Sequence, residues 1–337
     1  MTIVCLVVAL WGIKFDQVKA SFSRANYATL PIFIACTFLF YWVKAIRWKC
    51  LLQPMREFRT KEVFPPLMIG FMGNNVLPAH LGEFVRVYVL GQQYRLSKTA
   101  VFSTVVLERI WDVIAILLFF SIGLVLVPGL PENFKTASIF VASATVITIL
   151  LLVAYVIWTE HFVRSANWLL DRLPLPETLR IVFVKMLDSG AIGFTSMRSA
   201  KLTFWIVITS IHQWFLAGVI VYIALQSFDI QVTILEAFIV VGVTAFGVTI
   251  PSTPGFFGVI QLCFWLSLRL FDVSKEDAFA ASVYYQISQY IPVTLLGLYY
   301  LNRFGLRLGD IEKRATEQEE MNMMESTQKN PSDQATS

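Results

Sequence analysis

The sequence predicts an all-α polytopic membrane protein with about eight transmembrane helices. Of its 337 residues, 56% are hydrophobic and only 15% are charged, whereas an ordinary soluble domain carries about 25% charged residues. Several apolar runs approach or exceed the ~20 residues that a helix needs to cross a ~30 Å hydrocarbon core. These runs are continuous rather than alternating, which argues against a membrane β-barrel.

The expected spans follow the apolar runs. The first is short, but it has no clear basic region or small-residue cleavage site, so we interpret it as a transmembrane helix rather than a signal peptide. The eight expected spans are Met1–Ile13, Ala28–Ile46, Ala100–Val127, Ala137–Trp158, Thr203–Gln226, Leu235–Ile250, Phe257–Leu270 and Ala278–Leu301.

Residues 63–90 do not resemble an ordinary span. Prolines and glycines divide them into apolar runs too short to cross. Broken backbone at membrane depth is tolerated where protein or a water-filled cavity surrounds it. We therefore expect a re-entrant pair of half-helices with its tip near Asn74–Pro78. The breaking residues are Pro65, Pro66, Gly70, Gly73, Pro78 and Gly82.

Two further sections lie outside the spans. Residues 159–201 are polar, with apolar residues at helical spacing, which predicts cytoplasmic amphipathic helices on the membrane surface. Residues 306–337 are rich in polar residues and are expected to form a disordered cytoplasmic tail. The transmembrane domain is thus expected to cover residues 1–305.

Lysine and arginine predict the orientation. If both termini, residues 44–98 and residues 159–201 are cytoplasmic, about 20 of the 27 basic residues lie inside and about six outside. We therefore expect a multi-pass protein of the inner (plasma) membrane. The net charge of +4 follows this topology, so it does not indicate a nucleic-acid partner. The cysteine and histidine spacings indicate no metal site, and we expect no cofactor.

A first polar constellation lies beside the broken element. Glu83 and Arg86 are spaced i,i+3, and Glu108 and Asp112 are spaced i,i+4 with Arg109 adjacent, so each pair shares a helix face. Charged side chains at membrane depth usually face a partner, a cavity or a substrate. One interpretation is a polar cavity open to the cytoplasmic leaflet, where arginine grips phosphate. The other is that these residues pair with one another and fasten the third span to the re-entrant element.

A second constellation is Thr249–Gly258, TIPSTPGFFG, in which proline and glycine end one helix and start another. The free N–H groups of a half-helix favour an anion such as lipid phosphate. The alternative is a tight cytoplasmic hairpin. Weaker candidates are His212-Gln213, Gln286 and Gln289, because a lone polar residue in a span is more often an interhelical hydrogen bond than a ligand.

These motifs resemble the flippase-like transmembrane region of lysylphosphatidylglycerol synthases and its stand-alone relatives. The first signature is matched by Asn75, by Pro78 to Glu83 and by Arg86, with His80 where arginine is usual, and the Glu-Arg-x-x-Asp element by Glu108, Arg109 and Asp112. In the second signature Pro251, Thr253, Pro254, Gly255 and Gly258 match, but Phe256 replaces a glycine and Gln261 a glutamate. The family usually has a Tyr-Arg pair in the last span, and here this pair is Tyr285-Gln286.

The replacements at 261 and 286 are consistent with each other, because a glutamate at 261 and an arginine at 286 could have neutralised each other. The resemblance covers residues 1–305 and implies a lipid headgroup as ligand. It implies a substrate-binding set of Asn75, His80, Glu83, Arg86, Glu108, Arg109, Asp112, Thr253, Gly255 and Gly258.

We therefore expect a non-enzymatic, flippase-like transporter that binds an anionic phospholipid or a polyprenyl or glycolipid headgroup. No GxxxxGK[ST] motif for ATP is present. The alternatives are a membrane enzyme or enzyme subunit acting on a lipid-linked substrate, and a scaffold for a lipid-modifying enzyme. The expected partners are membrane lipid and either such an enzyme or a second copy of the chain.

Overall fold

The computed structural model describes residues 2–77, 81–130, 199–249 and 254–306, together with positions 136, 143, 146 and 147. Every regular element among these residues is a helix, as predicted. Apart from a few positions, the expected fourth span, the amphipathic section 159–201 and the tail lie outside the described residues.

Four helical stretches are long and apolar enough to cross a membrane, so the chain is a multi-pass membrane protein, but eight crossings are not confirmed. The four are Tyr27–Leu52, Lys98–Leu126, Ala200–Gln226 and Pro254–Phe271. The first three contain helices α3 (Leu30–Leu52), α6 (Lys98–Leu126) and α10 (Ala200–Gln226). The last helix, α13 (Lys275–Arg303), has 29 residues and a length of about 43 Å, which is also enough to cross.

The N-terminal segment differs from the prediction. Helix α1 (Thr2–Leu10) has nine residues and a length of about 14 Å, so it is too short to cross the core alone. A helix that the sequence analysis did not predict follows, α2 (Phe15–Arg24). The N-terminus of α13 anchors this region: the Lys275 ammonium donates to the carbonyls of Val8 and Trp11, at 3.0 and 2.7 Å.

The expected broken element is a helical hairpin. Helix α4 (Thr60–Val76) and helix α5 (Gly82–Tyr94) are joined through residues 77–81. The rings of Phe58, just before α4, and Tyr94, at the end of α5, lie 5.0 Å apart, so the hairpin enters and leaves at one end of the molecule. Its second arm measures about 20 Å, less than the hydrocarbon core. This geometry agrees with the re-entrant interpretation.

Three glycines let the two arms of this hairpin pack closely. A Cβ atom at Gly70 would lie 2.8 Å from the Arg86 Cβ, one at Gly73 would lie 2.8 Å from the Gly82 Cα, and one at Gly82 would overlap the Gly70 carbonyl. The expectation that Pro65 and Pro66 break the helix is wrong, since α4 continues through both. Each proline removes the backbone hydrogen bond to the carbonyl four residues earlier without ending the helix.

The structure contains a second hairpin where the sequence analysis expected two crossings. Helix α11 (Ile234–Thr249) and helix α12 (Val259–Leu268), with the short turns η3 (Pro254–Phe256) and η4 (Arg269–Phe271), run out and back. Leu235 near its start and Phe271 at its end pack on the same apolar cluster around Leu124 and Ile239. Helices α11 and α12 measure about 24 and 15 Å, each less than the core. With η3 and η4, α12 forms the longer apolar stretch Pro254–Phe271.

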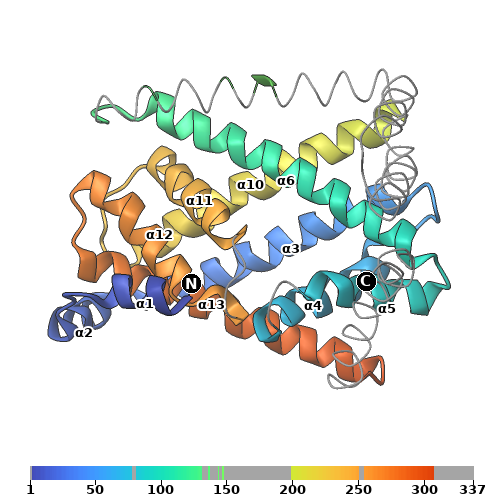
Figure 1. The fold of residues 1–337 in the computed structure, drawn as a ribbon, viewed down its shortest axis with the longest axis horizontal. Helices are drawn as coiled ribbons and strands as arrows, with labels where there is room; N and C mark the ends of the chain where they lie inside the picture. The colour runs from blue at the N-terminus through green and yellow to red at the C-terminus, as the bar shows by residue number, and fades with distance from the viewer. Residues whose placement is uncertain are drawn as a thin grey trace, which may run out of the picture.

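The tips of the two hairpins meet at the middle of α13. On the α4 side, the Asn75 amide donates to the Thr294 hydroxyl at 2.9 Å, and the Tyr290 hydroxyl donates to the Asn75 carbonyl at 3.4 Å. On the other side, the Phe257 and Tyr290 rings lie 5.7 Å apart. In Figure 1, α11 and α12 occupy the left half and α4 and α5 the right half, while α13 runs past both. The hairpins therefore enter from opposite ends.

The two ends carry different charge. At the end where α4 begins and α5 returns, the exposed or half-exposed basic residues are Lys49, Arg56, Arg59, Lys61, Arg95, Lys98, Lys201 and Arg303, against the acids Glu57 and Glu62. At the other end the basic residues are Lys14, Lys19, Arg24, Arg269 and Lys275, against Asp16, Asp229, Glu236, Asp272, Glu276 and Asp277. This asymmetry among the described residues agrees with a cytoplasmic location of the α4–α5 end.

Candidate functional site

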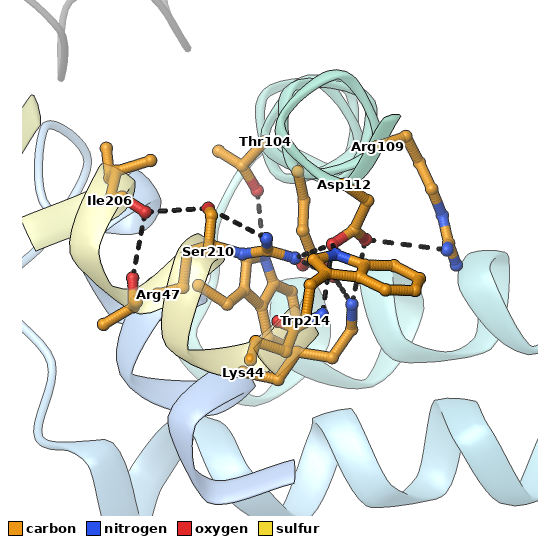
Figure 2. Close-up of polar contacts among 12 residues, drawn as sticks. Lys44, Arg47, Thr104, Arg109, Asp112, Ile206, Ser210 and Trp214 are labelled. Carbon is orange, nitrogen blue, oxygen red and sulfur yellow. Dashed lines mark hydrogen bonds and ion pairs between the residues drawn. The ribbon is translucent and has the colours of Figure 1, made fainter. Parts of the chain in front are cut away.

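Asp112, in the middle of α6, is the centre of a buried charged network. One of its carboxylate oxygens, Oδ1, accepts from Arg47 at 2.6 Å, Trp214 at 2.9 Å and Gln213 at 3.1 Å. The other, Oδ2, accepts from Lys44 at 3.1 Å. Figure 2 shows donors from α3 and α10 converging on this carboxylate. Asp112 therefore ties three long helices together.

Glu108, one helical turn before Asp112, extends the network to the first hairpin. Its Oε1 lies 2.7 Å from the Lys44 ammonium, and its Oε2 accepts from Arg86 of α5 at 3.0 Å. The Arg86 guanidinium also lies over the Trp48 ring, 4.9 Å from its centre. The close packing at Gly70 brings the Arg86 stem against α4, so the glycines of the hairpin determine where this arginine points.

Glu83 and Arg109 form the edge of the network. Their side chains make an ion pair, and Arg109 also lies 3.8 Å from Asp112. The Arg109 side chain is 43% exposed and that of Glu83 is 16% exposed. This pair links α5 to α6 at the side where the network approaches the surface.

The other charged residues are closed in by protein. The relative exposures of Lys44, Arg47, Arg86, Glu108 and Asp112 lie between 0% and 3%. The structure therefore corrects the expectation of a polar cavity open to one leaflet, because these groups pair with one another, as the fastening interpretation expects. The third span is indeed joined to the broken element, through Arg86 and Glu108.

The network has more positive than negative charge. Within the described residues Lys44, Arg47 and Arg86 face only Glu108 and Asp112, while Arg109 and Glu83 offset each other. Among the buried atoms without a hydrogen-bond partner are two charged donors, Arg86 Nη2 and Arg47 Nε. The others near the network are Trp111 Nε1 and the oxygens Glu108 Oε1 and Gln213 Oε1. A buried donor without a partner is costly, and more so when it is charged. An anion bound here would compensate the surplus positive charge and would accept from the unpaired donors.

Sequence reasoning missed two members of the network. Lys44 and Arg47 were assigned to a cytoplasmic basic stretch after the second span, but α3 continues to Leu52 and buries both. Their i,i+3 spacing on one helix face was the signal that was available. Gln213, a weaker candidate, makes an interhelical hydrogen bond to Asp112, as lone polar residues in spans usually do.

The second constellation forms a separate, uncharged network. The Gln261 amide donates to the Gln286 oxygen at 2.6 Å, and the Gln286 amide donates to the Gly255 carbonyl. The Gly258 N–H donates to the Gln261 oxygen at 2.6 Å. Gly255 and Gly258 have φ of 72° and 87°, which glycine adopts readily. Of the expected site residues, Asn75 contacts Thr294 and Tyr290 of α13, and His80 and Thr253 lie outside the described residues.

These observations define a class of protein: a multi-pass helical membrane protein with a buried charged network and two broken-helix hairpins that meet near its centre. The sequence profile of the Lysylphosphatidylglycerol synthase TM region matches residues 1–297. The chain therefore belongs to this family, as the motifs predict.

Three curated relatives are UPF0104 membrane proteins from archaea. One from Methanocaldococcus jannaschii is 26% identical over 226 residues, covering 66% of this chain and 90% of the relative. A second from that organism is 24% identical over 265 residues, covering 76% and 78%. One from Methanothermobacter thermautotrophicus is 22% identical over 320 residues, covering 90% and 93%. No solved structure matches the chain significantly.

Proposed function

We propose that this chain binds the phosphate-bearing headgroup of an anionic phospholipid or polyprenyl-linked glycolipid and helps to move it between the leaflets of the inner membrane. The observation that carries the proposal is the cation surplus of the buried network, in which Arg86 Nη2 has no acceptor. Arginine suits this role because its planar fork binds phosphate oxygens in pairs.

The exposed edge of the network supplies an entry point. Arg109 is the most accessible cation of the cluster, and its partner Glu83 lies on the α5 arm that also carries Arg86. A headgroup phosphate that replaces Glu83 on Arg109 would remove one of the two ion pairs that hold this arm to α6, leaving the pair between Arg86 and Glu108. Arg86 would then become accessible to the phosphate, while the acyl chains stay in lipid.

The two opposed hairpins support movement rather than binding alone. Transporters commonly place their sites at interrupted helices near the bilayer midplane, between elements that enter from opposite sides. Here both tips contact Tyr290, next to the midpoint of α13. With the basic end cytoplasmic, the α4–α5 arm faces that side and the α11–α12 arm the other. The C-terminal end of α13, at Arg303, would then be cytoplasmic.

The contacts of the carboxylates weigh against the rival proposal of a lipid-linked group-transfer enzyme. Glu108 and Asp112 each lie within ion-pair distance of two or more cations, which favours their charged form over the role of a proton acceptor. The scaffold proposal depends on residues 159–201, which lie outside the described residues apart from their last three positions.

The test is lipid movement in liposomes that contain the purified protein, with fluorescent anionic and zwitterionic phospholipids as probes. We expect the wild type to move the anionic probe faster. Arg86→Gln should reduce this rate at least tenfold, and Arg109→Gln should reduce it less. The exposed arginine at the end of α13 supplies the matched control, Arg303→Gln, which should behave as wild type.

Because Arg86→Gln leaves Glu108 with one fewer cation, folding must be checked by size-exclusion chromatography and thermal unfolding. Arg109→Gln keeps the test decisive if the first variant does not fold, since Arg109 is partly exposed. Equal rates for the wild type, Arg109→Gln and protein-free liposomes would contradict the proposal. Turnover of a lipid-linked donor without bilayer movement would favour the enzyme instead.

A further inference from the structure

Lys44 occupies a special place in the buried network. Its ammonium lies between the two carboxylates, 2.7 Å from Glu108 and 3.1 Å from Asp112. Its side chain is 3% exposed. The surplus positive charge is therefore enclosed in protein, where an uncompensated charge is strongly unfavourable.

Only one group can relieve this surplus by changing its protonation. Arginine does not lose its proton in proteins, so Arg47 and Arg86 remain charged. Protonation of Glu108 or Asp112 would add to the surplus. Lysine, in contrast, gives up its proton readily when it is buried. Release of one proton from Lys44 makes the network of three cations and two anions neutral.

The groups that face Lys44 come from five helices. The charged ones are Arg47 of α3, Glu108, Arg109 and Asp112 of α6, and Glu83 and Arg86 of α5, in contact with Lys44 or with its partners. Helix α4 contributes the Phe71 ring, 5.5 Å from the ammonium, and α10 contributes neutral groups, Ser210, Gln213 and Trp214.

We propose that Lys44 takes up one proton when an anionic headgroup enters the network and releases it when the headgroup leaves, so that lipid binding is coupled to a proton. This inference rests on the proposed function. The charges balance in both states: the neutral amine with no anion, and the ammonium with one negative charge of a phosphodiester. No other bond forms or breaks.

The geometry accommodates both protonation states. An ammonium has three N–H donors, and a neutral amine keeps two. Two donors are enough for the contacts to Glu108 and Asp112, so loss of the proton does not require the carboxylates to move. Neither protonation state of Lys44 therefore requires a different arrangement of the helices.

The experiment measures proton uptake on binding. The purified full chain in detergent is titrated with a short-chain phosphatidylglycerol, with short-chain phosphatidylcholine as the zwitterionic comparison. Isothermal titration calorimetry in buffers of different ionisation enthalpy counts the protons bound, between pH 6 and pH 9. We expect about one proton per anionic lipid and, at alkaline pH, an affinity that falls about tenfold per pH unit, as linkage requires for one proton.

Three variants assign the proton. Lys44→Met and Lys44→Arg should each abolish proton uptake and make the affinity independent of pH, because neither side chain can titrate. Lys49→Met, a change on the same helix outside the network, should retain the wild-type behaviour. Lys44→Arg preserves the charge of the buried cluster, so it can replace Lys44→Met in this test if Lys44→Met does not fold.

The outcomes separate the two proposals. Wild-type protein that binds phosphatidylglycerol without taking up a proton overturns the role of Lys44 and leaves lipid binding intact. Proton uptake that persists in Lys44→Arg overturns the assignment in the same way. Failure of the wild type to distinguish phosphatidylglycerol from phosphatidylcholine overturns the proposed function and this inference with it.

Discussion

Gln261 and Gln286 are joined by a hydrogen bond of 2.6 Å between α12 and α13. The family resemblance places a glutamate and an arginine at these two positions, so the amide pair stands where an ion pair is implied. The Gln286 amide also donates to the Gly255 carbonyl, and the Gln261 oxygen accepts from the Gly258 N–H. The two side chains therefore fix the turn of the second hairpin without charge.

The first prediction restores that charge pair. Gln261→Glu alone buries an unpaired carboxylate and should destabilise the protein by about 3 kcal/mol. Adding Gln286→Arg should recover most of the loss, because the two side chains are in direct contact. Thermal unfolding in detergent measures the double-mutant cycle. Additive losses in the double variant would show that the two positions do not interact.

The second prediction concerns the packing of the first hairpin. Gly82→Ala should destabilise the protein and reduce lipid movement, since its Cβ would overlap the Gly70 carbonyl. Gly91→Ala on the same helix is the control, because its new Cβ would lie 3.2 Å from the Lys98 side chain and 3.3 Å from the Leu96 carbonyl, much less close than the overlap at Gly82. We expect a loss of about 2 kcal/mol for Gly82→Ala, within the range for overpacked cores, and less for the control. Equal unfolding temperatures would show that the arms pack less closely.

The third prediction concerns Asp112. Asp112→Ala removes the acceptor of Arg47, Lys44, Gln213 and Trp214 and should cost about 3–5 kcal/mol, the usual effect of breaking a buried ion pair. Combining it with Lys44→Met should cost less than the sum of the two single changes, because the second change removes a stranded cation. Asp16→Ala on α2, which is exposed, should cost less than about 0.5 kcal/mol.

The fourth prediction tests the directions of the hairpins. In a background that lacks Cys5, Cys36, Cys50 and Cys263, single cysteines are introduced at Glu57, Arg95, Asp229 and Asp272. A membrane-impermeant maleimide should label the first two positions from one side of the membrane and the last two from the other. Labelling of Glu57 and Arg95 from opposite sides would mean that the α4–α5 segment crosses.

The sequence predicted the first hairpin better than the second for a physical reason. In the sequence, prolines and glycines divide 63–90 into short apolar runs, which disfavours a crossing, although α4 continues through Pro65 and Pro66. Segments 235–250 and 257–270 are each apolar almost throughout, so composition cannot distinguish a span from one arm of a hairpin. The return is visible only in the tertiary contacts. Leu235, at the start of segment 235–250, and Phe271, just after segment 257–270, pack on the same apolar cluster.

The charged site was predicted in part. Glu83, Arg86, Glu108, Arg109 and Asp112 come together as their spacing indicated. Their burial could not be predicted, because it depends on α3 and α10, which lie far away in the sequence. Lys44 and Arg47 were not predicted as members of the site because they also lie far from it in the sequence. Their position at the end of an apolar run is typical of residues that flank a span.

The meeting of the two hairpins at α13 has a consequence for permeability. An ordinary bundle insulates the two aqueous phases with the full thickness of its helices. Here the described contact between the two short hairpins is made at Tyr290 by Asn75 and Phe257. We expect small side chains at these positions to let ions pass more easily, so that cells carrying such variants lose membrane potential even when the lipid site is unchanged.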